Sequence, residues 1–569
     1  MKINTQSWRR GTALAGVLIV IASAFSAARA AEDNPNEWPS YGRTQGNTRF
    51  SPLNQINTKN VNQLKLAYTL QFGALRSNEA TPIVIGDTLY VSSSWGPKSV
   101  WALDAATGAK KWAYEPELPP DMMQYACCDV DSRGVTFSDG KIFVGRLDGF
   151  LVALEAASGK EIWKTQVVDY KQGSAITSPP LVVGDVVITG FAGGEYGVRG
   201  SLQGFDIATG KELWRTFLTA APGEANGDTW VGDGALHGGG TAWNVGSYDA
   251  TTDTVFWGTS NPSPTFFGQG RVGAPADASK ITNLYTSSMV ALDPHTGKIK
   301  WWQQATPQDN WDYDGMAEAV VADIDIDGKP APAVMRADRN GFFMINNRKD
   351  GKLLSAEPYA PINWAKSFDL KAGRPVEDQE KRINATTTTK NICPSWLGAK
   401  NWQPMSYNPQ TKLAYIPSNN TCMDLKGGET SFKRGVFTVG AAELNFLPGP
   451  GGYGGDLIAW DPVKQAKVWD VKQPLPFNGG TMTTAGNLVF QGDINGWFHA
   501  YDATDGKELW KFNVGSGMGA GAMTYSVGGK QYVAIVVGHS VTIPSVMDAT
   551  GKAILSATPE GGALMVFSP

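Results

Sequence analysis

The stretch WALDAATGAKKW, residues 101–112, decides the fold because the chain repeats its pattern. Each full copy has a short apolar run, an acidic residue, a turn with Gly, and a Trp four positions after that Gly. Gly supplies the positive φ of a tight hairpin turn, and the flanking Val, Ile, Leu and aromatic residues predict strands. The other full copies are VALEAASGKEIW (152–163), GFDIATGKELW (204–214), VALDPHTGKIKW (290–301) and AYDATDGKELW (500–510), and the weaker ones are IAWDPVKQAKVW (458–469) and MINNRKDGKLL (344–354).

The spacing of the repeats is that of a propeller. Trp112, Trp163 and Trp214 lie 51 residues apart, which is the period of a blade of four short strands. A radial array of such sheets protects its edges by closing on itself, and the recurring Trp is suited to fill the space between blades. Seven copies and one blade closed by the two chain ends predict an all-β, eight-bladed β-propeller with Trp-docking motifs; seven blades also fit.

The first thirty residues differ from the rest. A cationic start, MKINTQSWRR, precedes an apolar run and the sequence AARA, which predicts a secretory signal peptide over residues 1–30. The alternative is an uncleaved membrane anchor, although the run is shorter than the roughly 20 apolar residues that a spanning helix needs. Residues 31–569 are then a single propeller domain, exported to a compartment where disulfides can form.

Charge and residue counts exclude several functions. The formal net charge is −4 and no basic tract is present, so nucleic acid is not an expected partner. Four histidines in 569 residues argue against a His-based metal centre or a Ser-His-Asp hydrolase. Two of the four cysteines, Cys127 and Cys128, are neighbours. The residues alone leave it open whether these two pair with each other or with Cys393 and Cys422.

The segment QDNWDYDG, residues 308–315, carries the strongest chemical signal. On a strand, Asp312 and Asp314 would point to one face, and Trp311 and Tyr313 to the other. Two carboxylates on one face repel each other unless a cation lies between them. The pattern therefore predicts a site for a hard metal ion with oxygen ligands; the alternative is an acidic turn that faces water.

Several stretches match one family in the right order. The repeats, YACCDVDSRG (125–134), HGGGTAW (237–243) and the WDYD segment resemble the quinoprotein alcohol dehydrogenases, eight-bladed propellers that hold pyrroloquinoline quinone (PQQ) on the propeller axis. The resemblance runs over essentially all of the mature chain, from WPSYGRTQGNTRFSPLNQI (38–56) onward. It identifies residues 31–569 as a PQQ-binding catalytic domain.

The resemblance implies how PQQ is held. Neighbouring Cα atoms lie about 3.8 Å apart, below the usual span of a disulfide, so a Cys127–Cys128 ring is strained; in the family it lies against one face of PQQ. Trp243 would cover the other face, and Cys393 and Cys422 would form an ordinary disulfide. Cations and hydrogen-bond donors should meet the three carboxylates and the o-quinone. The matching positions are Glu79, Arg133, Thr177, Gly193, Gly194, Arg339 and Asn401.

The resemblance also implies a metal and a base. Glu195, Asn261 and Asp312 match the set that holds Ca²⁺ in many members. Asp314 resembles the lanthanide-dependent branch, because three carboxylates balance a trivalent ion; Ca²⁺ is the alternative. The metal would act as a Lewis acid on PQQ, and Asp312 would take the hydroxyl proton of the alcohol as catalytic base, so that hydride passes to PQQ and an aldehyde forms.

Substrate and partners follow from the same resemblance. The chain has no CxxCH haem-attachment motif, so a separate cytochrome c in the periplasm is the expected electron acceptor. Asn478 stands where the methanol enzymes tend to carry Trp, which favours a broader range of primary alcohols, including polyols or sugars. The alternatives are a Ca²⁺-dependent sugar or polyol dehydrogenase and a non-catalytic periplasmic scaffold. Many relatives form homodimers, although no segment here specifies an interface.

Overall fold

The computed structural model describes residues 34–569 except 96–98, 127, 269–270, 272–279, 327 and 429. The expected signal peptide, residues 1–30, lies outside the described residues. In the part of the chain that is described, no helix is both long and apolar enough to cross a membrane.

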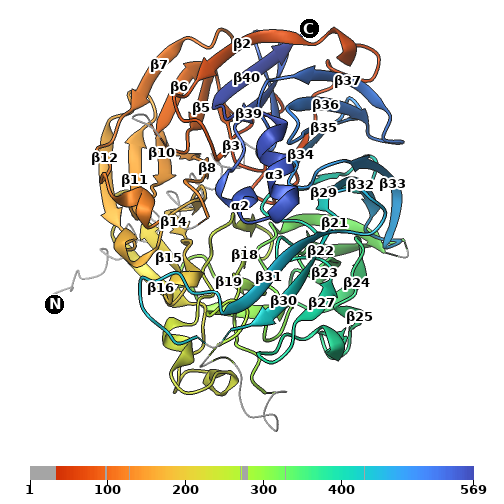
Figure 1. Ribbon diagram of the computed structural model, residues 1–569. Coiled ribbons are helices and arrows are strands. Elements are labelled where there is room, and N and C mark those ends of the chain that lie inside the picture. The colour runs from red at the N-terminus through yellow and green to blue at the C-terminus, as the bar shows by residue number, and fades with distance from the viewer. Residues whose placement is uncertain are drawn as a thin grey trace, which may run out of the picture.

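Eight sheets of four or five strands surround a common centre (Figure 1). Within each sheet, consecutive strands of the repeat pair antiparallel. The first four sheets consist of β4 (Ile83–Ile85), β5 (Thr88–Ser92), β6 (Val100–Asp104) and β7 (Lys110–Tyr114); β9 (Thr136–Ser138), β10 (Lys141–Gly145), β11 (Phe150–Glu155) and β12 (Glu161–Gln166); β13 (Leu181–Val183), β14 (Val186–Thr189), β15 (Ser201–Asp206) and β16 (Glu212–Phe217); β17 (Ser247–Asp249), β18 (Thr254–Gly258), β19 (Ser288–Leu292) and β20 (Ile299–Gln304).

The other four sheets complete the ring. They consist of β21 (Val320–Ile326), β22 (Lys329–Ala337), β23 (Phe342–Asn347) and β24 (Leu353–Pro358); β28 (Ser406–Asn408), β29 (Leu413–Asn419), β32 (Gly455–Asp461) and β33 (Ala466–Gln473); β34 (Thr481–Thr484), β35 (Leu488–Gly492), β36 (Trp497–Asp502) and β37 (Glu508–Asn513), with β1 (Phe50–Ser51) parallel to β34; and β38 (Met523–Val527), β39 (Lys530–Val537), β40 (Ala563–Ser568) and β2 (Lys65–Gln71).

The last sheet joins the two ends of the described chain. Strand β2 pairs antiparallel with β40, with Lys65 opposite Ser568. This confirms that one blade is closed by both chain ends. The β-propeller architecture is confirmed, and the eight sheets are consistent with the eight blades expected from the repeats.

The repeated Trp docks one blade onto the next. The indole Nε1 of Trp112 donates to the carbonyl of Ala156, in the turn of the following sheet, at 2.9 Å. A Cβ on Gly159 of that turn would lie 2.5 Å from the Trp112 ring, so the turn needs Gly for close approach as well as for its φ of 73°. The same indole-to-carbonyl bond recurs from Trp163 to Ile207, Trp214 to Pro294 and Trp469 to Ala503.

Apolar side chains are buried between neighbouring sheets. Val187 and Phe205 of one blade pack with Phe143 and Leu151 of the preceding blade, for example. Because every blade contributes to two such interfaces, the burial that stabilises the ring is spread around it.

The remaining elements lie outside the blades. They are β3 (Asn78–Thr81) paired in parallel with β8 (Ser132–Gly134); the hairpin β25 (Ala365–Asp369) and β26 (Arg374–Glu377); the sheet β27 (Thr389–Ile392), β30 (Thr421–Gly427) and β31 (Ala441–Pro448); the helices α2 (Thr542–Ser545) and α3 (Asp548–Ala557); and the short 3₁₀ turns η1 (Val61–Gln63), η2 (Met122–Gln124), η3 (Tyr170–Gln172), η4 (Gly194–Tyr196), η5 (Gly227–Thr229), η6 (Gly234–His237) and η8 (Gln379–Lys381). In Figure 1, α2 and α3 lie in front of the centre of the ring.

The cysteines are accounted for in part. Cys393 and Cys422 form a disulfide, so the alternative in which they pair with the two neighbouring cysteines is wrong. Cys128 is itself disulfide-bonded. Its neighbour Cys127 lies outside the described residues, and the vicinal ring stays a prediction.

Candidate active site

A cavity of about 100 Å³ lies among loops that come from several blades. Ten of the residues expected from the sequence line it: Cys128, Arg133, Thr177, Gly193, Glu195, Trp243, Asp312, Asp314, Arg339 and Asn401. Residues far apart in the chain thus meet in one place. Glu79, Gly194 and Asn261 are not in its lining. Gly194 stands between the lining residues Gly193 and Glu195 in the chain, and Glu79 and Asn261 contact Arg133 and Asp314.

The WDYD segment forms a loop between β20 and β21, so the expectation of a strand is wrong. Asp312 and Asp314 both have left-handed backbone, with φ of 66° and 54°. Asp309, buried behind the loop, accepts hydrogen bonds from the backbone N–H groups of Trp311, Tyr313 and Asp314 at 2.9–3.0 Å. This buried carboxylate replaces the missing sheet bonds and stabilises an otherwise costly conformation.

The side chains of the loop nevertheless point to the sides that the sequence predicted. Asp312 and Asp314 line the cavity, whereas the rings of Trp311 and Tyr313 are fully buried and stack with centroids 5.7 Å apart. The strand argument therefore placed the right residues on the right sides for the wrong reason. The signal that it missed is Asp309, whose side chain folds the loop.

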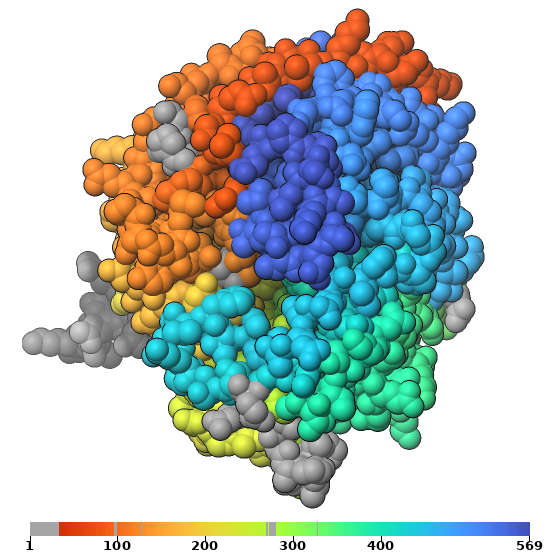
Figure 2. Space-filling model, in the orientation of Figure 1, coloured from red at the N-terminus to blue at the C-terminus, as the bar shows by residue number. Residues whose placement is uncertain are grey.

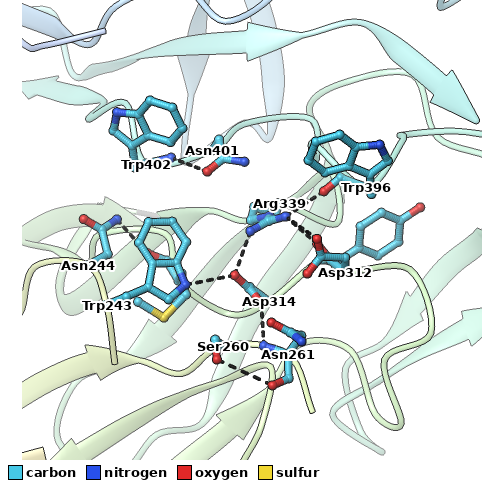
Figure 3. Close-up of polar contacts among 12 residues, drawn as sticks. Trp243, Asn244, Ser260, Asn261, Asp312, Asp314, Arg339, Trp396, Asn401 and Trp402 are labelled. Atoms are coloured by element: carbon cyan, nitrogen blue, oxygen red, sulfur yellow. Dashed lines mark hydrogen bonds and ion pairs between the residues drawn. The ribbon is translucent and has the colours of Figure 1, made fainter. Parts of the chain in front are cut away.

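Asp314 lies at the centre of the polar contacts (Figure 3). Its Oδ2 accepts from Arg339 Nη1 at 2.7 Å and from Trp243 Nε1 at 3.2 Å. Its Oδ1 accepts from the backbone N–H of Asn261. One carboxylate thus ties together segments from two neighbouring blades.

Arg339, in the turn between β22 and β23, holds the acidic loop in place. Besides Asp314, its guanidinium donates through Nη2 to the carbonyls of Asp312 and Trp396, each at 2.6 Å. The same Nη2 lies 3.5 Å from the carboxylate of Asp312. The planar fork of Arg suits it to bind several acceptors at once.

Asn261 and Glu195 approach the acidic loop from two other segments. The amide nitrogen of Asn261 donates to the carbonyl of Pro262 at 2.9 Å and to the hydroxyl of Thr265 at 3.0 Å. Since its nitrogen is committed to these acceptors, the amide oxygen is the atom that remains available as a ligand. Glu195 lies in the turn η4 and lines the cavity.

Burial makes ionisation of the acidic groups costly. It raises the pKa of Asp314 to about 7, against the opposing effect of Arg339. Burial also raises the pKa of Asp312 well above its usual range, with Arg339 opposing and the charges of Asp314 and Glu195 adding to the increase. The pKa of Glu195 is raised by burial too. A bound cation would favour the charged forms of all three groups.

A second polar cluster forms another wall. Arg133 Nη2 lies 2.8 Å from Glu79 and 3.4 Å from Asp131, and its guanidinium faces the rings of Trp243 and Trp402 at 5.0 and 5.4 Å. Burial raises the pKa of Asp131 to about 7 and that of Glu79 well above its usual range. Arginine, carboxyl groups and two indoles therefore share one buried surface.

Polar atoms in these walls lack hydrogen-bond partners among the described residues. They include Arg133 Nε and Nη1, Glu79 Oε1, Asp131 Oδ1, Arg339 Nε, and the Nε1 atoms of Trp396 and Trp402. Buried polar groups are normally paired, so such a concentration beside a cavity indicates a site that binds a highly polar molecule. Both donors and acceptors are present in this set.

The sequence analysis missed part of the lining. Asp131, Ala192, Trp396, Trp402 and Ile543 also border the cavity. Asp131 stands within the segment YACCDVDSRG and Trp402 directly follows Asn401, whereas no pattern marked Ala192, Trp396 or Ile543.

Asn478, which the sequence singled out for the range of alcohols, lies away from the cavity lining. The residue is 4% exposed. Its Nδ2 donates to the carbonyl of Leu475 at 2.8 Å, and its Oδ1 accepts from the N–H of Ile494 at 3.0 Å. Because both ends of the amide are satisfied within the protein, Asn478 does not polarise the mouth of this cavity.

Comparison with known proteins assigns the family. The family described as "PQQ: Glucose/ethanol/alcohol dehydrogenase, beta-propeller domain" matches residues 38–363 and 455–533. The chain belongs to the PQQ-dependent alcohol dehydrogenases. It is 40% identical over 531 residues to the lanthanide-dependent methanol dehydrogenase of Methylacidiphilum fumariolicum (strain SolV), covering 89% of this chain and 85% of that protein.

Two further relatives extend the comparison. The chain is 39% identical over 524 residues to the 1-butanol dehydrogenase (cytochrome c) of Thauera butanivorans, covering 88% of this chain and 74% of that protein. The solved structure of a europium-containing methanol dehydrogenase superimposes with a TM-score of 0.90 at 37% identity, covering 96% of this chain and all of that one. Membership of this enzyme family favours an alcohol dehydrogenase over a non-catalytic scaffold.

The cavity walls suit the cofactor of the PQQ-dependent alcohol dehydrogenases. PQQ carries three carboxylates and an o-quinone, which match the unpaired donors of Arg133, Arg339 and Trp402. In the described part of the chain, no three His, Cys, Asp or Glu side chains are grouped closely enough to form a ready metal site. The acidic side chains nevertheless line the same cavity, and carboxylates with an amide oxygen are the donors that a hard cation prefers.

Proposed function

We propose that this chain is a periplasmic dehydrogenase that oxidises primary alcohols to aldehydes with PQQ and one lanthanide ion, and that passes its electrons to a cytochrome c. The observation that carries the proposal is the meeting of Asp312 and Asp314 with Arg339, Glu195 and Trp243 at one cavity. The periplasmic location rests on the predicted signal peptide and the cytochrome on the resemblance, supported by a relative named for cytochrome c.

The walls described above are suited to hold PQQ. Trp243 would cover one face, and Cys128, bonded as predicted to Cys127, the other. Arg133 and Arg339 would bind carboxylate and quinone oxygens. The remaining contacts would come from Glu79, Thr177, Gly193, Gly194 and Asn401. The hydroxyl of Thr177 donates to the carbonyl of Trp243 at 3.0 Å, which holds the backbone of the stacking residue.

The metal would be held by Glu195, Asp312, Asp314 and the amide oxygen of Asn261. Three carboxylates and a neutral amide carry three negative charges, which balance a trivalent ion and exceed the charge of Ca²⁺. When bound, the metal and PQQ supply a Lewis acid and a two-electron acceptor for the hydride of the alcohol. Asp312 takes the hydroxyl proton onto its carboxylate, and Arg339 holds Asp312 by its carbonyl while it does so.

The choice of metal and substrate can be tested in one experiment. Apo-protein is reconstituted with PQQ and titrated separately with La³⁺ and Ca²⁺, and turnover is measured over primary alcohols, polyols and sugars with an artificial dye. We expect La³⁺ to support turnover of primary alcohols more strongly than Ca²⁺ does. Turnover with Ca²⁺ alone, mainly of sugars or polyols, would instead identify a Ca²⁺-dependent sugar or polyol dehydrogenase. No turnover with either metal would contradict the proposal.

A further inference from the structure

A segment from one side of the ring crosses to the other beside the cavity. Residues 428 and 430–440, here called the strap, connect β30 to β31. In Figure 1 the strap is the cyan ribbon that leaves these strands and reaches the region of β15 and β16, and Figure 2 shows its atoms on the surface there. More than 200 positions separate the strap from the turn η4 that it contacts.

The turn under the strap carries Glu195, and its own backbone does not fix it. Gly193 precedes η4 with φ of 109°, and Gly197 follows it with φ of 65°. Glycine has wide conformational freedom on both sides of a short turn. Contacts from elsewhere are therefore needed to hold Glu195 at one position.

The strap supplies such contacts through its backbone. The N–H of Thr438 donates to the carbonyl of Glu195 at 2.9 Å, and the N–H of Gly435 donates to the carbonyl of Tyr196 at 3.0 Å. Tyr196 is also held between two surfaces. Its ring meets that of Phe437 edge-on, with centroids 5.5 Å apart, and lies so close to Gly173 that a Cβ there would be 2.1 Å from the Tyr196 ring.

Phe432 fastens the strap at a second point. Its ring stacks on that of His237, with centroids 3.9 Å apart and planes inclined by 9°. A Cβ on Gly197 would lie 2.4 Å from the Phe432 ring, so this glycine also leaves room for the strap. His237 ends η6 and precedes the glycine run that leads to Trp243. Phe432 thus packs against both segments that carry site residues.

We propose that the strap positions Glu195 for the metal ion, with Phe432 and Phe437 as positioning residues. The proposal rests on the proposed function, because it takes Glu195 to be a metal ligand. The side chains of Phe432 and Phe437 are 43% and 54% exposed. Because exposed apolar rings contribute little to a core, neither ring is a main source of stability. Their packing therefore matters mainly for the turn beneath them, and their loss should weaken metal binding more than it lowers stability.

The test measures metal affinity directly. Wild-type protein and the variants Phe432→Ala, Phe437→Ala and Phe432→Leu are reconstituted with PQQ and titrated with Tb³⁺, whose luminescence is sensitised by nearby Trp. We expect Phe432→Ala to bind Tb³⁺ about 10-fold more weakly, the lower end of the effect seen when the support of a ligand is removed. Phe432→Leu, which keeps an apolar side chain, should recover part of the affinity.

Val436→Ala is the matched control. Val436 is in the strap and 41% exposed, and its substitution should leave the affinity unchanged. Thermal unfolding of the apo-proteins shows whether each variant folds. If Phe432→Ala does not fold, the Tb³⁺ affinities of Phe432→Leu and Phe437→Ala, each compared with wild type, decide the question.

Two results must be kept apart. If wild-type protein binds neither PQQ nor Tb³⁺, the proposed function itself fails. If the wild type binds both, and the folded phenylalanine variants bind Tb³⁺ as Val436→Ala does, the strap does not position Glu195 and only the present proposal is overturned.

Discussion

The turns of the docking repeat, here called the outer turns, and the loops that line the cavity, here called the inner loops, differ in how their polar groups are paired. In the outer turns, an acidic side chain caps its own turn, as Asp104 does for the N–H groups of Ala106 and Thr107. The indoles of Trp112, Trp163, Trp214 and Trp469 are bonded to carbonyls of the next blade. At the cavity, several buried donors and acceptors have no partner within the described part of the chain, and Asp312 and Asp314 have left-handed backbone. The acidic caps pair the N–H groups of the outer turns within the protein, whereas the inner loops present polar groups suited to a bound molecule. Substitutions in the two regions should therefore fail in different assays.

The largest effect is expected at Asp312. Asp312→Asn keeps the size of the side chain but removes the base, so turnover with saturating metal and PQQ should fall by about 10²–10⁴-fold. Steady-state kinetics with a primary alcohol measures this. Asp323→Asn is the control, because Asp323 has a side chain that is 64% exposed on β21. A fall of less than 10-fold at Asp312 would show that another group takes the proton.

A smaller loss of turnover is expected when Asp314 is substituted, because this residue is expected to affect metal affinity rather than proton transfer. Asp314→Ala removes one negative charge and the shorter of the two ion pairs of Arg339, so lanthanide binding should weaken at least about 10-fold and turnover at limiting lanthanide should fall with it. Asp314→Asn keeps one side-chain oxygen, which can still accept from the N–H of Asn261, and therefore removes the charge while this bond is retained. Unchanged lanthanide titrations for both variants would remove Asp314 from the metal shell.

The same contrast explains what the sequence could predict. The docking turns repeat, so the period, the Trp and the Gly were enough to give the blades and their order. The inner loops do not repeat, and their residues were found through matches to a family. Asp309 shows the limit: the QDNWDYDG segment contains it, but nothing in a linear pattern shows that its carboxylate would accept three backbone bonds. Ile543 reaches the cavity from α2, a placement that depends on how the chain returns across the ring.

Asp456 is a buried carboxyl outside the cavity. It tests whether a raised carboxyl pKa is confined to the cavity or follows from burial elsewhere in the protein as well. Burial raises the pKa of Asp456, on β32, to about 6, although Lys472 lies 2.7 Å away. Because the folded pKa is above the unfolded value near 3.9, the folded protein binds the proton more tightly, and Asp456 should add stability as pH falls from about 7 to 4.

Comparison of wild type with Asp456→Asn isolates this contribution. Between pH 7 and pH 4.5, the free energy of unfolding of the wild type should rise relative to that of the variant by about 1–3 kcal/mol, since one pKa unit corresponds to about 1.4 kcal/mol. Denaturant unfolding at the two pH values measures it. If the difference in unfolding free energy between wild type and Asp456→Asn stays constant, or changes in the opposite direction, the ion pair with Lys472 outweighs burial and holds the carboxyl charged.

The smallest effect belongs to the outer turns and concerns stability alone. Trp112→Phe retains an aromatic ring between two blades but removes the bond to the carbonyl of the buried residue Ala156. Losing one such bond should cost about 1–2 kcal/mol of unfolding free energy, while kcat and metal affinity stay as in the wild type. Trp302→Phe, at a position 40% exposed on β20, is the matched control and should change neither quantity. A lower turnover of folded Trp112→Phe would show that the blade interfaces and the cavity are coupled, so the two regions could not be treated separately. The strained loop at the cavity would then depend on the spacing between blades that the docking Trp sets.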